Sequence, residues 1–296
     1  MHTWHILPLE TCRIHQKELR EERIKLCADI ESRSSFKLLK EDPTVQLIVY
    51  FHGAAGTLGS DWRPHGYRAL SATSSNVHIL VIDYCGFGTS TGWPSEAGLI
   101  IDGLTLAKFA TEQAGVPPER TVIFAQSMGT AVAIAVTHHF ALQSPPVLYA
   151  GTVLVAPFAD VASLTRTYRL AGVVPLLSPL AVFLSSLLAL LNKFTQTKFL
   201  SKEKLADLIR HLDAVKVHDR SQKYDITLIH AEDDYDIPWT HSDVLFWHAA
   251  NATLDVNVSM TSEDFGKVKA KQKMSLGAEG WEMEWKARAE LCAYRL

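Results

Sequence analysis

The amino-acid sequence predicts an α/β fold, in which a mostly parallel central sheet carries helices on both faces. Continuous apolar and β-branched runs indicate strands that are buried on both faces. Five such runs lie at 44–51, 77–84, 121–125, 149–155 and 226–230. Apolar residues at helical spacing occur between and after these runs, which predicts βαβ units and therefore parallel strands. These helices are expected at 96–114, 130–142 and 239–250.

The turns that follow the predicted strands carry small and polar residues. Four of them contain glycine, serine or aspartate, at 52–57, 85–90, 126–129 and 231–236. In sheets of this kind, ligand sites lie at the carboxyl ends of the strands. The sequence therefore predicts that the functional residues gather at this edge of the sheet.

Composition limits the classes of function. The chain has 296 residues, of which 47% are hydrophobic and 21% charged, so it can bury a substantial core. Its net charge of -3 argues against a general nucleic-acid binder, because no basic surplus neutralises phosphates. The four cysteines are scattered without a CxxC pair, so we expect no zinc site, no disulfide framework and no cofactor. Residues 1–20 lack a signal-peptide pattern, and we expect a cytoplasmic location or association with the endoplasmic-reticulum membrane.

Ser127 is the candidate nucleophile. It lies between a predicted strand and an alanine- and valine-rich helix, which is the context of a nucleophile elbow. Such a turn is tight and requires small residues two positions before and after the serine, where the chain has Ala125 and Gly129. The geometry would aim the backbone N–H of Met128 at a developing oxyanion. The alternative is a serine in an ordinary strand-to-helix turn.

Two segments near the ends of the chain are rich in charged residues. Residues 10–42 are dense in charge, which predicts solvated helix and turn before the core begins, or alternatively an interaction arm. We therefore place an N-terminal charged segment at 1–43 and one domain at 44–296. The tail from Thr261 is rich in lysine and glutamate, and it carries only one strand-like piece, near 281–285.

An uncharged stretch at 170–192 is long enough to span a membrane by length alone. Pro175 and Pro179 interrupt it, and a single crossing between two sheet strands would divide one domain across the membrane. We interpret residues 165–200 as a small helical cap. It is either a buried helix pair or a lid whose apolar face lines an acyl pocket or contacts a lipid surface. Three leucines at helical spacing form that face: Leu184, Leu187 and Leu191.

Several turns together resemble those of the α/β-hydrolases, over about residues 44 to 250. The segment His52–Gly56 is similar to an HG-x-x-G turn, and 83–90 resembles D-Y-R-G-x-G-x-S, with Cys85 where arginine is common. The segments 93–96, 230–234 and 4–8 are similar to one branch of that superfamily. This branch contains the lysophospholipid and monoacylglycerol lipases of the α/β-hydrolase domain-containing type 12 kind. The resemblance implies that the Ala54 N–H is the second oxyanion donor, beside that of Met128.

The acid of the implied triad follows the fifth strand. In this fold the triad order is serine, acid, histidine, and the acid precedes a hydrophobic-Pro pair. Asp234 fits, because it lies four residues before Pro238 with Ile237 between them. Its flanking carboxylates Asp233 and Asp236 are interpreted as solvated loop residues. The acid would hold the imidazole in one tautomer and stabilise its charged form.

The base is where the sequence departs from the family pattern. The family histidine follows the last strand, and here no histidine follows His248. His241 is an alternative base, but it lies with His248 on the helix after the fifth strand, where packing roles are common. His52 and His230 are expected to form hydrogen bonds within their own turns. A truncated gene model or splice form would explain the missing histidine, and also Met1 lying three residues before the Trp4 motif.

The leading interpretation is a serine hydrolase that cleaves a carboxylic ester through a Ser–Asp–(His) triad and an acyl-enzyme. The substrate would be a lipid such as a monoacylglycerol or a lysophospholipid, with peripheral membrane contact through the cap and the oligomeric state left open. The alternative is a non-catalytic binding protein on the same fold. Dehalogenase chemistry needs a carboxylate at the elbow, whereas position 127 is serine. Without a base the serine is a poor nucleophile, so we expect this chain to hydrolyse a short p-nitrophenyl ester poorly.

Overall fold

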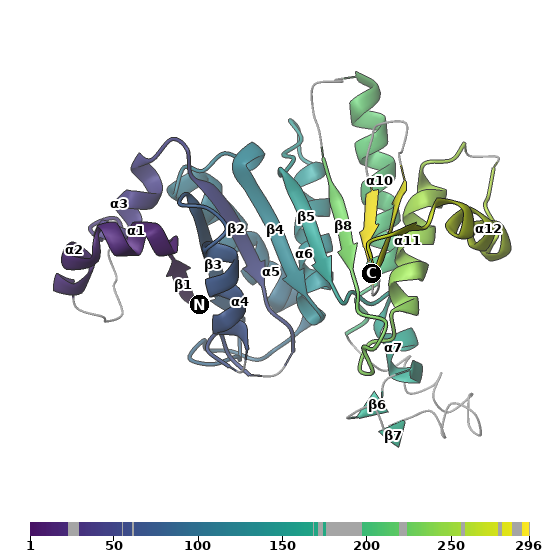
Figure 1. Cartoon of the computed structure of the whole chain (residues 1–296), viewed down its shortest axis with the longest axis horizontal. Coiled ribbons are helices and arrows are strands. Elements are labelled where there is room, and N and C mark those ends of the chain that lie inside the picture. Colours follow the sequence, from purple (N-terminus) through teal and green to yellow (C-terminus); the bar gives the residue numbers. More distant parts are fainter. Residues whose placement is uncertain are drawn as a thin grey trace. The chain divides into compact units, whose positions relative to one another are not determined.

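A computed structural model provides the fold. The structure describes residues 1–22, 30–54, 56–60, 62–167, 169–170, 174–175, 197–218, 224–255, 258–277, 280–285 and 292–295. The chain divides into two compact units, Met1–Ile123 and Phe124–Leu296. Figure 1 labels most of the helices and strands of the two units.

The first unit contains three strands in the order β1-β3-β2. Their bounds are His2–Ile6 for β1, Gln46–Phe51 for β2 and Val77–Asp83 for β3. β2 and β3 are parallel, whereas β1 pairs antiparallel with β3. Every residue of β3 is buried, which accounts for the uninterrupted apolar run. The sequence analysis predicted β2 and β3 but not β1.

The first unit also contains helices. They are α1 (Leu9–Ile14), α2 (Gln16–Glu21), α3 (Ser34–Glu41), α4 (Arg63–Ser71) and α5 (Glu96–Lys108), followed by the π-helical η1 (Phe109–Gln113) and the 3-10 helix η2 (Pro118–Arg120). The helix predicted at 96–114 is thus α5 continued by η1. Ser95 caps α5 by accepting the Gly98 N–H. The expectation that the core begins only after the charged segment is wrong, because Phe36 and Leu39 of α3 are each only 1% exposed.

The strands of the second unit follow the order β4-β5-β8-β11-β10-β9. β4 (Thr121–Gln126) begins at the end of the first unit, and the others are β5 (Gly151–Val155), β8 (Ile226–Ile229), β9 (Met274–Ser275), β10 (Trp281–Trp285) and β11 (Cys292–Arg295). β8 is parallel to β5 and β11, whereas β10 is antiparallel to β11 and β9. The tail therefore supplies three strands and not one, so that part of the sequence prediction is wrong. A separate pair, β6 (Arg169–Leu170) and β7 (Val174–Pro175), is antiparallel.

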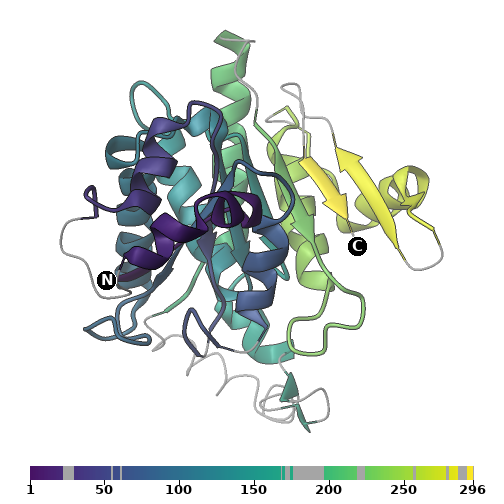
Figure 2. The same cartoon turned by 60° about the vertical axis from the view of Figure 1, so that its left-hand side comes forward.

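Five helices of the second unit are described. They are α6 (Met128–Ala141), α7 (Val161–Thr167), α10 (Ser201–His218), α11 (Thr240–Ala252) and α12 (Ser262–Gln272). α6 packs against α10, and α10 against α11 (Figure 1). α6 is buried along most of its length, as its apolar sequence requires. Figure 2 shows α12 beside the two C-terminal strands, and its first turn is closed by a capping box between Thr261 and Asp264.

Most of the predicted cap, residues 165–200, lies outside the described residues. This includes Leu184, Leu187 and Leu191, so the cap and its proposed apolar face remain a prediction. Among the helices that the structure does describe, none has the length and apolar character needed to cross a membrane.

Candidate active site

Ser127 lies between the end of β4 and the start of α6, as the sequence predicted. Its backbone has φ 50° and ψ -124°, a combination that L-amino acids rarely adopt. The Ser127 N–H donates to Val155 O of β5 at 2.9 Å, and its carbonyl accepts the Thr130 N–H at 2.9 Å. Ala125 and Gly129 are both buried. These contacts fix the turn on both sides of the serine.

The amino end of α6 begins immediately after this serine. The first N–H groups of a helix have no intrahelical acceptor and carry a partial positive charge. Ser127 makes no side-chain capping bond to them. Within the described part of the chain, no acceptor is recorded for the Met128 N–H. This donor is therefore available to a negatively charged group.

Asp234 is held in the loop that follows β8. Its Oδ1 accepts the N–H groups of Asp236 at 3.0 Å and Ile237 at 2.9 Å, and its Oδ2 lies 3.5 Å from His230 Nε2. Partial burial raises the pKa of the Asp234 carboxyl, but the hydrogen bonds from His230 and the Ile237 N–H outweigh burial and hold it below its ordinary value. The carboxylate is therefore fixed and charged. Asp233 and Asp236 are exposed, as expected for solvated loop residues.

His230 is fully buried beside this carboxylate. Its Nε2 lies 2.6 Å from Ile237 O, which can only accept, so Nε2 carries the proton. Its Nδ1 lies 2.6 Å from Ser242 Oγ. Both ring nitrogens thus bind the loop and helix around them. This is the role within its own turn that the sequence analysis predicted for His230.

His241, the alternative base, is only 4% exposed. Its Nδ1 accepts the Ala159 N–H at 3.4 Å, and its Nε2 lies 2.9 Å from Thr167 Oγ1. Burial, followed by the nearby His230, lowers the pKa of His241 to about 4. Among the described residues of the second unit, no imidazole is hydrogen-bonded to Ser127 Oγ. The contacts of His241 are those of a packing residue.

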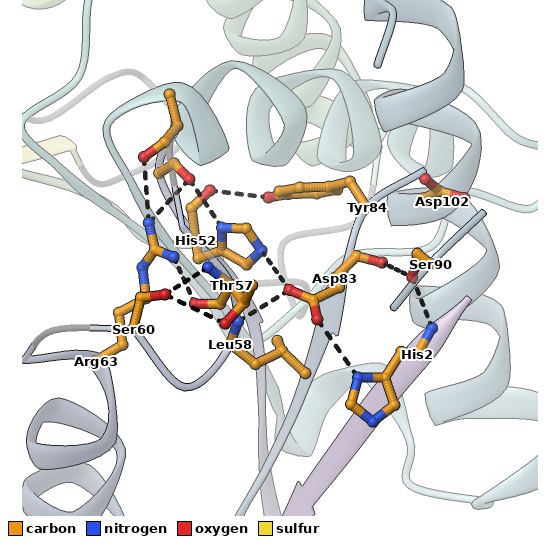
Figure 3. Close-up of polar contacts among 12 residues, drawn as sticks. His2, His52, Thr57, Leu58, Ser60, Arg63, Asp83, Tyr84, Ser90 and Asp102 are labelled. Atoms are coloured by element: carbon orange, nitrogen blue, oxygen red, sulfur yellow. Dashed lines mark hydrogen bonds and ion pairs between the residues drawn. The ribbon is translucent and has the colours of Figure 1, made fainter. Parts of the chain in front are cut away.

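The turn after β2, which contains Ala54, is held from several sides (Figure 3). His52 Nδ1 lies 2.8 Å from Gly53 O and must donate to it, so His52 also bonds within its own turn, as predicted. Arg63, at the start of α4, donates to three carbonyl oxygens: Gly53 O at 3.2 Å, Ala54 O at 3.2 Å and Thr57 O at 2.6 Å. The Tyr84 hydroxyl donates to His52 O at 3.1 Å. The carbonyl groups of this turn are therefore anchored.

Asp83 anchors the same turn from the end of β3. Its Oδ1 accepts the Leu58 N–H at 2.9 Å, and its main-chain oxygen accepts the Ser90 hydroxyl at 2.6 Å (Figure 3). A Cβ at Gly88 would lie 2.2 Å from Asp83 Oδ2, and Gly88 has φ 52°. Only glycine fits this position, which explains the spacing of the glycines in 83–90.

The described residues contain no group of three or more His, Cys, Asp or Glu side chains suited to holding a metal ion. The described arrangement therefore offers, in the second unit, a serine on a strained turn, a Met128 N–H for which the described residues provide no acceptor, and a fixed carboxylate. In the first unit it offers an anchored loop in which Ala54 is exposed.

Comparison with known proteins identifies the family. A profile of the alpha/beta hydrolase family matches residues 48–260 of this chain. The chain belongs to the alpha/beta hydrolase family. This confirms the resemblance found in the sequence and the predicted α/β-hydrolase fold.

Several curated alpha/beta hydrolases are similar to part of the chain. The "Lysophosphatidylserine lipase ABHD12" of Danio rerio is 33% identical over 122 residues, which are 41% of this chain and 30% of that protein. "Protein bem46" of Schizosaccharomyces pombe is 39% identical over 119 residues, which are 39% of each. The matched segment thus spans less than half the length of these relatives. A solved alpha-beta hydrolase from Vibrio vulnificus is 18% identical with a TM-score of 0.49, covering 76% of this chain and 70% of that one.

Sequence reasoning missed Arg63 in this alpha/beta hydrolase. A single arginine beside tryptophan and proline, at 62–64, carries no motif of its own. Its role depends on the fold, which places its guanidinium against a turn several residues earlier in the chain. No feature of the sequence distinguishes it from the exposed Arg68 of the same helix.

Proposed function

We propose that this alpha/beta hydrolase is a serine hydrolase that cleaves a carboxylic ester of a lipid. Ser127 Oγ would attack the ester carbonyl carbon while its proton passes to an imidazole. The N–H groups of Ala54 and Met128 would stabilise the oxyanion, the alcohol would leave, and water would hydrolyse the acyl-enzyme. Asp234 would orient the imidazole and stabilise its charged form.

The observation that carries this proposal is the backbone of Ser127. A residue other than glycine at φ 50° and ψ -124° costs free energy, and such conformations cluster at active sites. In α/β-hydrolases this strain exposes the serine hydroxyl at the end of the sheet strand. The Met128 N–H at the start of α6, which has no acceptor among the described residues, supports the same assignment.

The substrate class rests on the relatives. Several curated proteins that match this chain carry the name lysophosphatidylserine lipase. We therefore favour a lysophospholipid over a monoacylglycerol. Peripheral membrane contact through residues 165–200 belongs to the same proposal.

A second candidate is a non-catalytic lipid-binding protein of the same family. It is favoured by the histidines of the second unit, because both His230 and His241 have other partners at their ring nitrogens. A serine without a base keeps only the part of catalysis that the oxyanion donors and binding provide, about a thousandfold over water.

Initial rates of ester hydrolysis separate the two candidates. We expect slow hydrolysis of p-nitrophenyl butyrate and faster release of fatty acid from lysophosphatidylserine than from a monoacylglycerol of the same acyl chain. Ser127→Ala should abolish both, whereas Ser262→Ala, at an exposed serine, should change neither. Binding of lysophosphatidylserine without any hydrolysis would favour the second candidate. Hydrolysis that survives Ser127→Ala would overturn the proposed nucleophile.

A further inference from the structure

The turn after β2 has a consistent pattern of hydrogen bonds. Its carbonyl groups are occupied: His52 O by Tyr84, Gly53 O by His52 Nδ1 and Arg63, and Ala54 O by Arg63. By contrast, no acceptor for the Ala54 N–H is recorded within the described residues. Gly53 is buried and Ala54 is exposed. The turn therefore binds protein with its carbonyl groups and leaves the Ala54 N–H open.

The Gly53 carbonyl and the Ala54 N–H belong to one peptide group. A trans peptide group is planar, so its C=O and N–H point in opposite directions. Arg63 Nη2 and His52 Nδ1 both donate to Gly53 O, at 3.2 Å and 2.8 Å. These two donors therefore fix the direction of the Ala54 N–H, although neither touches it.

The same bonds also strengthen that N–H as a donor. Hydrogen bonds to a carbonyl oxygen polarise the peptide group and so strengthen the hydrogen bond that its N–H donates, by about 10–30% per bond. Arg63 is only 7% exposed, so the charge of its guanidinium is poorly screened by water. The guanidinium adds positive potential on the carbonyl side of the Gly53–Ala54 peptide group.

The guanidinium suits this position better than another cation would. Its rigid fork lets Nη1 bind Thr57 O while Nη2 binds Gly53 O and Ala54 O. Gly56 lies beside it with φ 68°, and a Cβ there would lie 2.7 Å from Ser60 Cβ and Oγ and 3.3 Å from Arg63 Nη1. A lysine ammonium is a single point charge and cannot span both ends of the turn.

We propose that Arg63, together with His52, is a positioning residue that sets the direction and strength of the Ala54 N–H as an oxyanion donor. The proposal rests on the proposed function, because it needs Ala54 to be such a donor. It goes beyond that function by naming the side chains that prepare the donor.

The test compares p-nitrophenyl acetate with its thiono analogue, in which C=S replaces C=O. Sulfur accepts hydrogen bonds weakly, so the thionoester gains little from an oxyanion donor. Removing one such donor lowers kcat by about a hundredfold to a thousandfold, and misaligning it costs less. We expect Arg63→Lys to lower the Ser127-dependent kcat for the oxoester about tenfold to a hundredfold with KM unchanged. The oxoester-to-thionoester ratio should fall by the same factor, because a general loss of structure would slow both substrates alike.

Two further variants complete the test. Arg68→Lys, at an exposed arginine of the same helix, should leave kcat and the ratio unchanged. If Arg63→Lys does not fold, as judged by circular dichroism, His52→Leu removes the other side-chain donor to Gly53 O and should lower the ratio in the same way. Ser127-dependent hydrolysis with an unchanged ratio in the folded variant would overturn the inference alone. The absence of any Ser127-dependent reaction in the unmodified chain would overturn the proposed function and the inference with it.

Discussion

Ser127 and Asp234 are each held by their backbone surroundings. The serine turn is tied to β5 and to the first turn of α6, and the carboxylate accepts two N–H groups of its own loop. The backbone conformation of Ser127 costs free energy, and the hydrogen bonds to the strand and the helix on either side offset this cost.

Replacing Ser127 tests this strain directly. Ser127→Gly should be more stable than Ser127→Ala by about 1 kcal/mol, because glycine adopts φ 50° without a steric cost. Urea unfolding of the two variants measures the difference. The same pair at Ser163, inside α7, should show the opposite order, since glycine weakens a helix by about 1 kcal/mol relative to alanine. Equal stability of the two Ser127 variants would mean that the turn is not strained.

Asp234 should contribute to stability in a pH-dependent way. In the fold, the pKa of the Asp234 carboxyl lies below its ordinary value of 3.8. The charged carboxylate therefore stabilises the fold fully above pH 3.8, and this stabilisation is lost as the pH falls through the folded-state pKa. Asp234→Asn should lower the free energy of unfolding by about 1 kcal/mol at pH 7. Unfolding curves at pH 7 and pH 3 should show this gap narrowing in acid. A gap of the same size at both pH values would contradict the assignment.

At the scale of elements, the pairing of β1 with β3 contains a histidine pair. His5 Nε2 lies 2.9 Å from His78 Nδ1, and the two rings are stacked with centroids 5.1 Å apart. Burial, followed by the proximity of His78, lowers the pKa of His5 to about 3. Burial lowers the pKa of His78 to about 4, and the nearby Asp42 carboxylate opposes this shift. Both imidazoles are therefore neutral in the fold.

This pair should make the fold sensitive to mild acid. Their folded-state pKa values lie below the ordinary 6.5, so the stabilisation is complete above that pH and is lost as pH falls below it. At pH 5 the loss is about 2 kcal/mol for each imidazole. Replacing both by leucine should reduce the fall in the free energy of unfolding between pH 7 and pH 5 by about 2 to 4 kcal/mol. An equal fall in both proteins, measured by urea unfolding, would show that these histidines do not titrate as described.

The sequence predicted the elements whose signal is local. β2, β3, β4, β5 and β8 are continuous runs of mostly apolar and β-branched residues, so each could be recognised as a strand from the sequence alone. β1 and β11 were missed because His2–Ile6 and Cys292–Arg295 are short and become strands only by pairing with β3 and β8. α12 was also missed, although Thr261 and Asp264 have the spacing of a capping box.

The residues of the candidate site also divide into those with a local sequence signal and those without one. Ser127 and Asp234 could be proposed as site residues because their turns have a fixed spacing of small residues and prolines. Arg63 was not found, because its task is to bind carbonyl oxygens, and backbone atoms leave no mark in the sequence. Residues that act on side chains can be predicted from motifs, whereas residues that act on the main chain require the fold.

At the scale of the whole molecule, the chain is an alpha/beta hydrolase by its match over residues 48–260. Membership of this family does not by itself decide between an ester hydrolase and a binding protein. The two differ in one physical property, the reactivity of the Ser127 hydroxyl. A binding protein needs no activated serine, whereas a hydrolase of any turnover rate does.

Covalent labelling with a fluorophosphonate tests that property most directly. The reagent forms a stable bond to an activated serine, so the adduct accumulates even where turnover of esters is slow. We predict one adduct per chain by intact mass, located at Ser127 by peptide mapping, retained in Ser262→Ala and absent in Ser127→Ala. Absence of an adduct from the unmodified chain, or an adduct that persists in Ser127→Ala, would contradict the assignment of Ser127 as the nucleophile.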